Sequence, residues 1–102
     1  MATKLGNTSL KFKLITPEGL VLEDEVVKVK VKTSEGGITI LPNHAELKSN
    51  IVPSTAKIYF ADANKEDQKF SIADGLMEVH PNAITIIASS AKPKEADDPF
   101  DV

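Results

Sequence analysis

The sequence feature that most constrains the fold is a strict alternation of apolar and charged residues. The run Val27–Lys32 reads Val-Lys-Val-Lys-Val-Lys. Successive side chains of a β-strand point to opposite faces, so this run predicts a strand with one buried face, formed by the valines, and one face in water. A lysine row of this kind can bind an anionic ligand, but it is more often the solvated side of an antiparallel sheet, where lysines also discourage edge pairing.

The same period of two recurs along the chain. Leu10, Phe12 and Leu14 alternate with Lys11 and Lys13. Further predicted strands cover residues 20–22, 38–41, 51–54, 56–61, 69–73, 76–79 and 83–88. Turn-forming residues separate these segments and few helical patterns intervene. The sequence therefore predicts an all-β fold, an antiparallel sandwich or flattened barrel.

Glycine and proline mark the turns. The stretch Ser34–Leu47 concentrates them, with a Glu-Gly-Gly hairpin connection before its short strand and a Pro-Asn-His turn after it. Asp74 and Gly75 form a two-residue turn signal, because type I′ geometry needs positive φ at both central positions. We therefore expect a valine at Gly75 to destabilise the domain more than an alanine at His44.

The composition fits one small domain with a flexible segment at each end. A chain of 102 residues with 41% hydrophobic content is too short to bury two separate cores. Residues 1–9 are polar without periodicity and predict a flexible N-terminus. Residues 92–102 hold two prolines and an acidic run and predict a mobile acidic tail. The β-domain is expected over residues 10–91, and Phe100 is a candidate docking residue in an otherwise solvated tail.

Composition also excludes several classes of function. The net charge of −3 gives no general basic footprint for nucleic acid. The absence of cysteine removes disulfides and thiol chemistry. No apolar run approaches the roughly 20 residues that span a bilayer, and the N-terminus lacks the apolar core of a signal peptide.

No catalytic or metal-binding constellation is evident. His44 and His80 are the only histidines, and they lie on different turns without metal-ligand spacing. There is no Gly-x-Ser-x-Gly sequence, and the Glu-Gly-Gly run at 35–37 lacks the spacing of a phosphate-binding loop. Carboxylate pairs such as Glu23 with Glu25 are expected to be exposed. We expect no cofactor, no metal and no enzymatic activity, only a binding or structural module.

Several segments together resemble one known family. They are Leu14-Ile15-Thr16-Pro17-Glu18-Gly19, Glu25-Val26, Thr33-Ser34-Glu35-Gly36, Ile40-Leu41-Pro42-Asn43-His44-Ala45, and Gly75 to Val79 followed by Ala83-Ile84-Thr85-Ile86-Ile87. In this order and spacing they resemble the N-terminal domain of the epsilon subunit of F-type ATP synthase. Each motif alone is weak, but the combination is fairly specific and covers residues 10–91.

The resemblance implies a ten-stranded β-sandwich, built from two five-stranded sheets, on the rotor of the ATP synthase. In this family the domain binds the foot of the gamma subunit and the polar loops of the c ring, and it does no chemistry. Its place is peripheral, on the cytoplasmic side of a bacterial membrane or the matrix or stroma side in an organelle. The turn expected to face the c ring contains Glu35, Gly36, Gly37, Pro42, Asn43 and His44. The candidates to face gamma are Phe70, Gly75, Leu76 and Met77.

The sequence departs from the family pattern at several positions. The family usually has glycine at the positions of Thr39, Asn43 and Ser54, and proline at that of Glu46. Asparagine also tolerates left-handed backbone, whereas a β-branched residue such as Thr39 would be strained if its φ were positive. Gly37 replaces an acidic or polar residue, which changes the charge expected at the contact with the c ring.

The helical hairpin that commonly follows this domain has no counterpart in the sequence. We therefore expect neither inhibition of hydrolysis nor nucleotide binding, and the chain is either a natural short epsilon subunit or a trimmed one. The alternative interpretation is a free-standing β-sandwich that binds a small ligand or peptide, with His44 and the neighbouring glycines lining a loop pocket.

Overall fold

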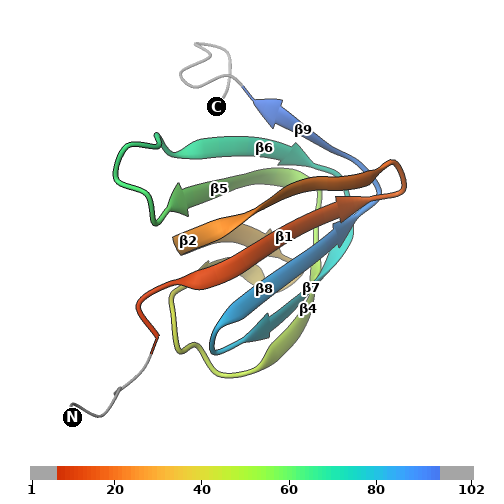
Figure 1. Ribbon diagram of the computed structural model, residues 1–102. Coiled ribbons are helices and arrows are strands. Elements are labelled where there is room, and N and C mark those ends of the chain that lie inside the picture. Colours follow the sequence, from red (N-terminus) through yellow and green to blue (C-terminus); the bar gives the residue numbers. More distant parts are fainter. Residues whose placement is uncertain (1–6, 95–102) are drawn as a thin grey trace, which may run out of the picture.

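The computed structural model describes residues 7–94 of the chain. In this range the chain forms nine β-strands arranged in two layers (Figure 1). The strands are β1 (Leu10–Thr16), β2 (Gly19–Thr33), β3 (Gly36–Ile40), β4 (Leu47–Ile51), β5 (Ser54–Phe60), β6 (Gln68–Ile72), β7 (Gly75–His80), β8 (Ala83–Ala88) and β9 (Ala91–Lys94). The predicted all-β sandwich is confirmed. Residues 7–94 include no helix that could cross a membrane.

Strand β2 belongs to both layers. Its first part, Gly19–Val26, pairs with β1, and its second part pairs with β5 on one side and β3 on the other. One layer therefore contains the first part of β2 with β1, β8, β7 and β4, and the other contains the second part with β3, β5, β6 and β9. Each layer has five strands when β2 is counted twice. This explains why ten strands were expected and nine are found.

The acidic run in the middle of β2 does not interrupt the strand, although two separate strands were predicted there. Lys13 lies opposite Glu23 with an ion-pair distance of 3.7 Å, and Lys11 lies opposite Glu25. Opposite charges on facing positions stabilise antiparallel pairs. The carboxylates therefore favour the pairing of β2 with β1.

A β-bulge at Val27 changes which valines are buried. The register with β5 shifts between Val26 and Lys28, and this leaves Val26 fully buried and Val27 38% exposed. The prediction that Val27 shares the buried face with Val29 and Val31 is therefore wrong. The extra residue of a bulge moves the following side chains to the opposite face.

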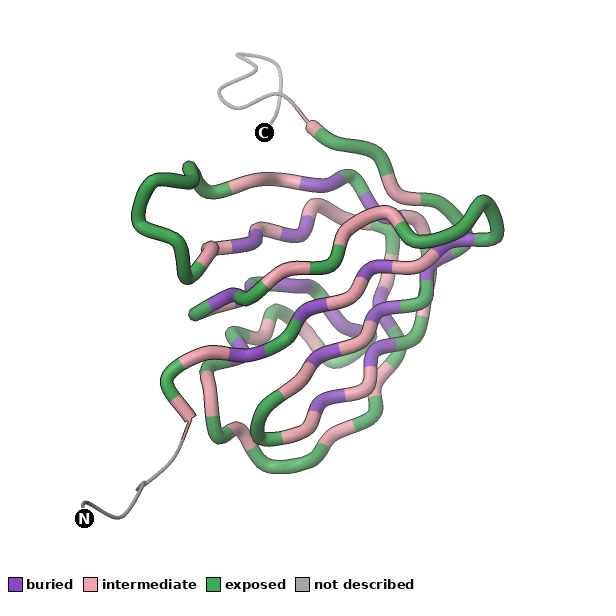
Figure 2. Tube along the Cα trace, in the orientation of Figure 1, coloured by how far each residue is buried: buried purple, intermediate pink, exposed green. Residues whose placement is uncertain are grey.

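The core lies between the two layers and is built by the inward-facing half of each strand. Buried and exposed residues alternate along most strands (Figure 2). In β8, Ile84 and Ile86 are fully buried and Ile87 is 53% exposed, as predicted. The largest fully buried side chains are Phe12, Leu10, Leu14, Ile40, Ile58, Met77, Ile84 and Ile86. Burial of each such side chain contributes about 1.5–3 kcal/mol to folding.

Regular structure extends beyond the predicted limits of the domain. Asn7 donates hydrogen bonds to Asn43 Oδ1 and Pro81 O, so the segment before β1 is tied to two loops. At the other end, β9 pairs with β6 and includes Pro93, which an edge strand tolerates because one side of it makes no ladder bonds. The packed domain therefore continues to Lys94 instead of ending at residue 91. Phe100 lies outside the described residues.

One ion pair joins the β5–β6 hairpin to β2 and makes stability depend on pH. The pKa of the Asp24 carboxyl is lowered by a hydrogen bond from Lys65 and by one from the Glu25 N–H, which donates at 2.8 Å. A carboxyl with a lowered pKa stabilises the fold above its unfolded pKa, here 3.8, and this contribution is lost as pH falls through the lower folded value.

We predict that Asp24→Asn reduces stability near pH 7, and that the difference from the parent declines below pH 3.8 and disappears once the pH is below the lower folded pKa of Asp24. Urea unfolding at a series of pH values measures this. Asp67→Asn, in the same hairpin but outside this ion pair, removes the same charge and is the control; its stability near pH 7 should stay within about 0.5 kcal/mol of the parent's. A difference for Asp24→Asn that persists at the lowest pH would contradict the assignment.

Candidate functional site

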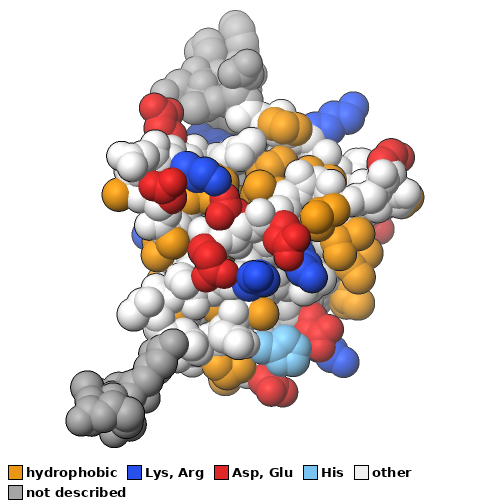
Figure 3. Space-filling model, viewed as in Figure 1, with side chains coloured by type: hydrophobic (Ala, Val, Ile, Leu, Met, Phe, Trp, Pro, Cys, Tyr) orange, Lys and Arg blue, Asp and Glu red, His pale blue; other side chains and the backbone are white. Residues whose placement is uncertain are grey.

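The outer face of the layer β2–β1–β8–β7 carries a row of exposed apolar side chains. Leu20 lies opposite Ile15, Ile15 opposite Ile87, and Ile87 opposite Leu76. Leu20, Ile87 and Leu76 are 56%, 53% and 49% exposed, and Ile15 is half-buried. We call these four residues the apolar row. Figure 3 shows hydrophobic side chains gathered at the right of this face, where β1 and β8 end.

The apolar row differs from the rest of the same face. The next row across the strands is polar, with Glu23, Lys13, Thr85, Glu78 and Lys48 in register. The outer side of an antiparallel sheet normally carries polar residues. A contiguous exposed apolar surface at one end of it therefore indicates contact with another molecule.

A shallow depression lies beside the apolar row, and Gly75 forms part of it. Its lining residues are Thr16, Pro17, Asp74, Gly75, Leu76, Ile87, Ala88 and Ser89. A Cβ atom at Gly75 would lie 2.6 Å from the Ile87 carbonyl oxygen and 3.0 Å from Ala88 Cα. Glycine is required at this position because the backbones of β7 and β8 approach closely.

The reason predicted for Gly75 is therefore wrong. Among the described residues φ is positive at Gly19, Gly36 and Asn43, and not at Gly75. Thr39 also has no positive φ, so its β-branched side chain is not strained. Asn43, with φ of 70°, adopts the left-handed backbone that was expected of it.

The four residues expected to face gamma divide between core and surface. Phe70 and Met77 are 2% and 0% exposed and pack in the core, so their side chains belong to no surface. Leu76 and the backbone at Gly75 remain at the surface. Sequence reasoning missed Leu20, Ile15 and Ile87. In the sequence, each of these residues could be noticed as an isoleucine or leucine at a strand position that the alternating pattern assigns to solvent. Only the strand register shows that they are neighbours.

The residues expected in one turn facing the c ring lie at both ends of β3. Glu35 lies in the turn from β2, and Gly36 and Gly37 are the first two residues of β3. Thr33 shapes this turn, since its hydroxyl donates to Gly36 O at 2.9 Å and accepts from Glu35 N–H at 3.1 Å. Gly36 has φ of 120°, a value that L side chains rarely adopt. This end of β3 lies beside the end of β4, because Ser34 N–H donates to Asn50 O.

Pro42, Asn43 and His44 lie in the loop that follows β3. Asn43 N–H donates to Pro81 O at 2.8 Å, and its side chain exchanges hydrogen bonds with Asn7. A strand of five residues spans about 17 Å, so this loop and the Glu-Gly-Gly turn are well separated. They are not one turn but the two flanks of an edge strand, since β3 pairs only with β2 among the described strands. His44 therefore lies beyond the opposite end of β3 from Gly36 and Gly37.

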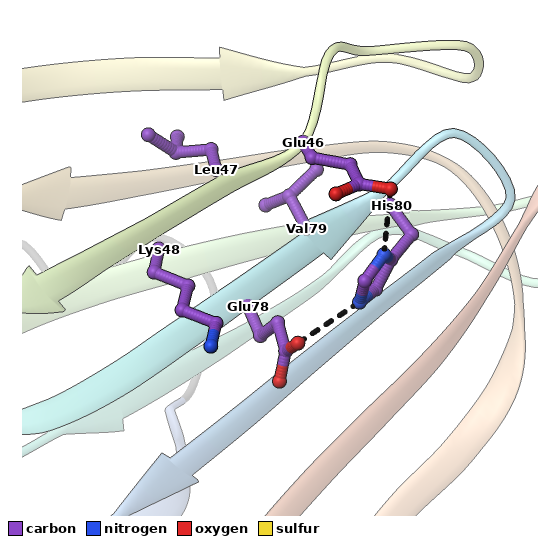
Figure 4. A pocket seen from close by; sticks show the side chains of 6 residues that line it. All are labelled: Glu46, Leu47, Lys48, Glu78, Val79 and His80. Atoms are coloured by element: carbon purple, nitrogen blue, oxygen red, sulfur yellow. Dashed lines mark hydrogen bonds and ion pairs between the residues drawn. The ribbon is translucent and has the colours of Figure 1, made fainter.

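A histidine between two carboxylates lies next to this loop. His80 Nε2 is 3.0 Å from Glu78 Oε2, and His80 Nδ1 is 3.6 Å from Glu46 Oε2 (Figure 4). The contact with Glu46 ties the loop after β3 to the end of β7, whereas the contact with Glu78 lies within β7. Within residues 7–94 no group of three or more histidine, cysteine or acidic residues is arranged to hold a metal ion. The arrangement is suited to positioning a loop.

Comparisons with known proteins give one consistent result. Residues 9–94 match the family model described as ATP synthase, Delta/Epsilon chain, beta-sandwich domain. Similar curated proteins are the ATP synthase epsilon chains of Rhizobium rhizogenes, 32% identical over 87 residues, and of Clostridium novyi, 32% identical over 90 residues. The matches cover 85% and 87% of this chain but only 63% and 67% of those relatives. The chain thus spans less than two thirds of the first relative.

Two solved structures share the fold. One is a chain in the cryo-EM structure of Euglena gracilis mitochondrial ATP synthase, OSCP/F1/c-ring, with a TM-score of 0.81 and 19% identity, covering 96% of this chain and 62% of that one. The other is in the central stalk/c-ring structure of Tetrahymena thermophila mitochondrial ATP synthase, with a TM-score of 0.71 and 21% identity, covering 96% and 76%.

Because backbone atoms surround the missing Cβ of Gly75, we predict that Gly75→Ala lowers the free energy of unfolding by about 2–3 kcal/mol. Gly75→Val should lower it further and cost more than His44→Ala. Gly37→Ala is the matched control, since a Cβ there would be 4.0 Å from Val31 O, the nearest atom outside its chain neighbours. Its effect should stay within about 0.5 kcal/mol. Equal unfolding midpoints for the two alanine variants in urea would contradict the close approach.

Proposed function

The chain belongs to the ATP synthase delta/epsilon family, whose β-sandwich domain it contains, and on this premise we propose that it is a non-catalytic subunit of the central stalk. In this role it links the gamma subunit to the c ring, so that rotation is coupled to ATP synthesis. The observation that carries the proposal is the apolar row on an otherwise polar sheet face. The two solved structures that share the fold are an OSCP/F1/c-ring assembly and a central stalk/c-ring assembly of ATP synthases, which supports these partners.

We assign the contact with gamma to the apolar row and the adjoining depression. Leu20, Ile87 and Leu76 offer large apolar side chains in one line across three strands. The core of a stable interface is depleted in charged residues and desolvates such side chains. The depression beside Gly75 is open for a side chain of the partner. This assignment keeps Gly75 and Leu76 from the sequence-based set and replaces the buried Phe70 and Met77.

We assign the contact with the c ring to β3 and its two flanks. The flanks contain Glu35, Gly36, Gly37, Pro42, Asn43 and His44. Backbone hydrogen bonds and side-chain caps fix the shape of both flanks. The free side of an edge strand also presents unpaired N–H and C=O groups, which suit polar loops of a partner. The position is peripheral to the membrane, with contact only through the complex.

The two assignments give the protein separate surfaces for two partners. The apolar row lies on the outer face of the layer with β1, whereas β3 is the edge of the other layer. A subunit that transmits torque must hold both partners at once, which requires surfaces that do not overlap. We propose no nucleotide, cofactor or reaction for these surfaces, and the sandwich acts as a rigid connector.

We predict that the double variant Leu76→Lys and Ile87→Lys binds purified gamma at least about tenfold more weakly, because two desolvated apolar contacts are replaced by charges. Surface plasmon resonance measures the affinity, and thermal unfolding checks the fold. Val27→Lys is the control, since Val27 is an exposed apolar residue outside the row. Unchanged gamma affinity in the double variant would remove the row from the interface.

For the c ring, we predict that Glu35→Lys combined with His44→Ala leaves binding to gamma intact and lowers ATP-driven proton pumping per ATP hydrolysed. The physical reason is the loss of polar complementarity along the β3 edge. Membrane vesicles reconstituted with the complex give both rates. Asp67→Lys, in the β5–β6 hairpin, should not change the ratio. Normal coupling in the double variant would argue against this edge.

A further inference from the structure

The outer face of the second layer collects most of the basic residues of the chain. It carries seven of the twelve basic residues, although the net charge is −3. We call this surface the lysine face: Lys28, Lys30 and Lys32 on β2, Lys57 on β5, Lys69 on β6, and Lys92 and Lys94 on β9. The lysines of β2, β5 and β6 lie on the side of their strand opposite to the buried residues. Lys92 and Lys94 lie opposite Ser71 and Lys69 on the same face. The described strand residues on this side include no carboxylate.

Four of these lysines lie in one cross-strand row. Lys30 is opposite Lys57, Lys57 is opposite Lys69, and Lys69 is opposite Lys94. Like charges on directly opposed positions destabilise a sheet. Lys94 Nζ donates to Thr55 Oγ1 at 2.9 Å, whereas Lys30, Lys57 and Lys69 take part in none of the ion pairs formed among residues 7–94. An anion placed over this row would therefore remove an unfavourable repulsion.

Tyr59 lies among the lysines and is itself held by them. The Nζ atoms of Lys28, Lys57 and Lys30 lie 4.2, 5.1 and 5.8 Å from its ring centroid. Burial acts to raise the pKa of Tyr59, but the hydrogen bond with Lys57 and the nearby lysine charges outweigh it, so the pKa is lowered. The positive charges of the face thus lower the pKa of its one described aromatic side chain.

The size of the lysine face and its borders favour a short anion. From Lys28 to Lys32 the lysines extend about 13 Å along β2, and from β2 to β9 they extend about 14 Å across the sheet. At one end the β5–β6 hairpin adds Asp62, Glu66 and Asp67, and Glu35 stands at the other end of β2. A long duplex or a bilayer surface extending past these borders would meet like charge. With Tyr59 already engaged, the face also offers no free aromatic ring for base stacking.

We propose that the lysine face is a docking site for a short acidic polypeptide segment of a partner protein. In an extended segment, every second side chain points to the same side at about 6.6–6.8 Å intervals, which is the spacing of Lys28, Lys30 and Lys32 along β2. Charge complementarity also speeds encounter with such a partner. The face lies on the opposite side of the sandwich from the apolar row, so this interaction is additional to the proposed contacts with gamma and the c ring.

The test uses the complete chain and a fluorescent octapeptide in which glutamate and serine alternate. Fluorescence anisotropy should show saturable binding that weakens with salt, since screening shortens the reach of charge. The triple variant Lys30→Gln, Lys57→Gln and Lys69→Gln should bind about tenfold more weakly, because three attracting ammonium groups are lost. The matched control changes Lys11, Lys13 and Lys48 to glutamine, which removes the same charge from the opposite outer face, and it should bind within about twofold of the parent.

Thermal unfolding gives a second readout. The octapeptide should raise the unfolding temperature of the parent and of the control, but not that of the lysine-face variant. If both triple variants lost the same affinity for the octapeptide, binding would depend only on net charge, and the proposal would be overturned. Tighter binding to an eight-nucleotide oligo-dT or to phosphatidylserine vesicles than to the octapeptide would make nucleic acid or a membrane the ligand of this face, and would overturn the proposal. Binding seen only after residues 95–102 are removed would make the chain's own acidic segment the occupant, and would also overturn it.

Discussion

The pairing of one long strand with four others is the constraint on which the rest of the structure depends. Strand β2 is hydrogen-bonded to β1, β3, β4 and β5, and it is the only described strand that belongs to both layers. The bulge at Val27 lets the chain leave one layer and enter the other. Because every later strand is placed relative to β2, its register decides which residues face the core and which become neighbours on each surface.

The two outer faces that result have opposite chemical character. On one face the register aligns Leu20, Ile15, Ile87 and Leu76 into an apolar row, and on the other it aligns lysines from β2, β5, β6 and β9. Both rows weaken an isolated domain, since one exposes apolar surface and the other opposes like charges. The partners proposed above would relieve each of these costs, and the faces point away from each other. A connector between several molecules needs this separation.

Close backbone approach and loop caps supply the finer geometry of the surfaces. The β7 and β8 backbones come together at Gly75, where even a methyl group would contact Ile87 O. Around β3 the shape comes from Thr33, Gly36 and Asn43, each acting through the backbone. In this region Thr33, Gly36 and Asn43 thus fix the path of the backbone, which suits the proposed role as a connector.

The sequence by itself determined most of the strands, the alternation of buried and exposed positions and most turns, because these depend on contacts within a few residues. Its motifs also indicated the family. It failed for β4, whose inward positions include Ser49 beside Leu47 and Ile51, so that the apolar pattern is weak. It also failed where the outcome depends on distant residues: the bulge at Val27, the reason for glycine at Gly75, the burial of Phe70 and Met77, and the placement of the turn residues at two ends of β3. Only the tertiary structure decided which side chains meet across strands, because register is set by packing between segments far apart in the chain.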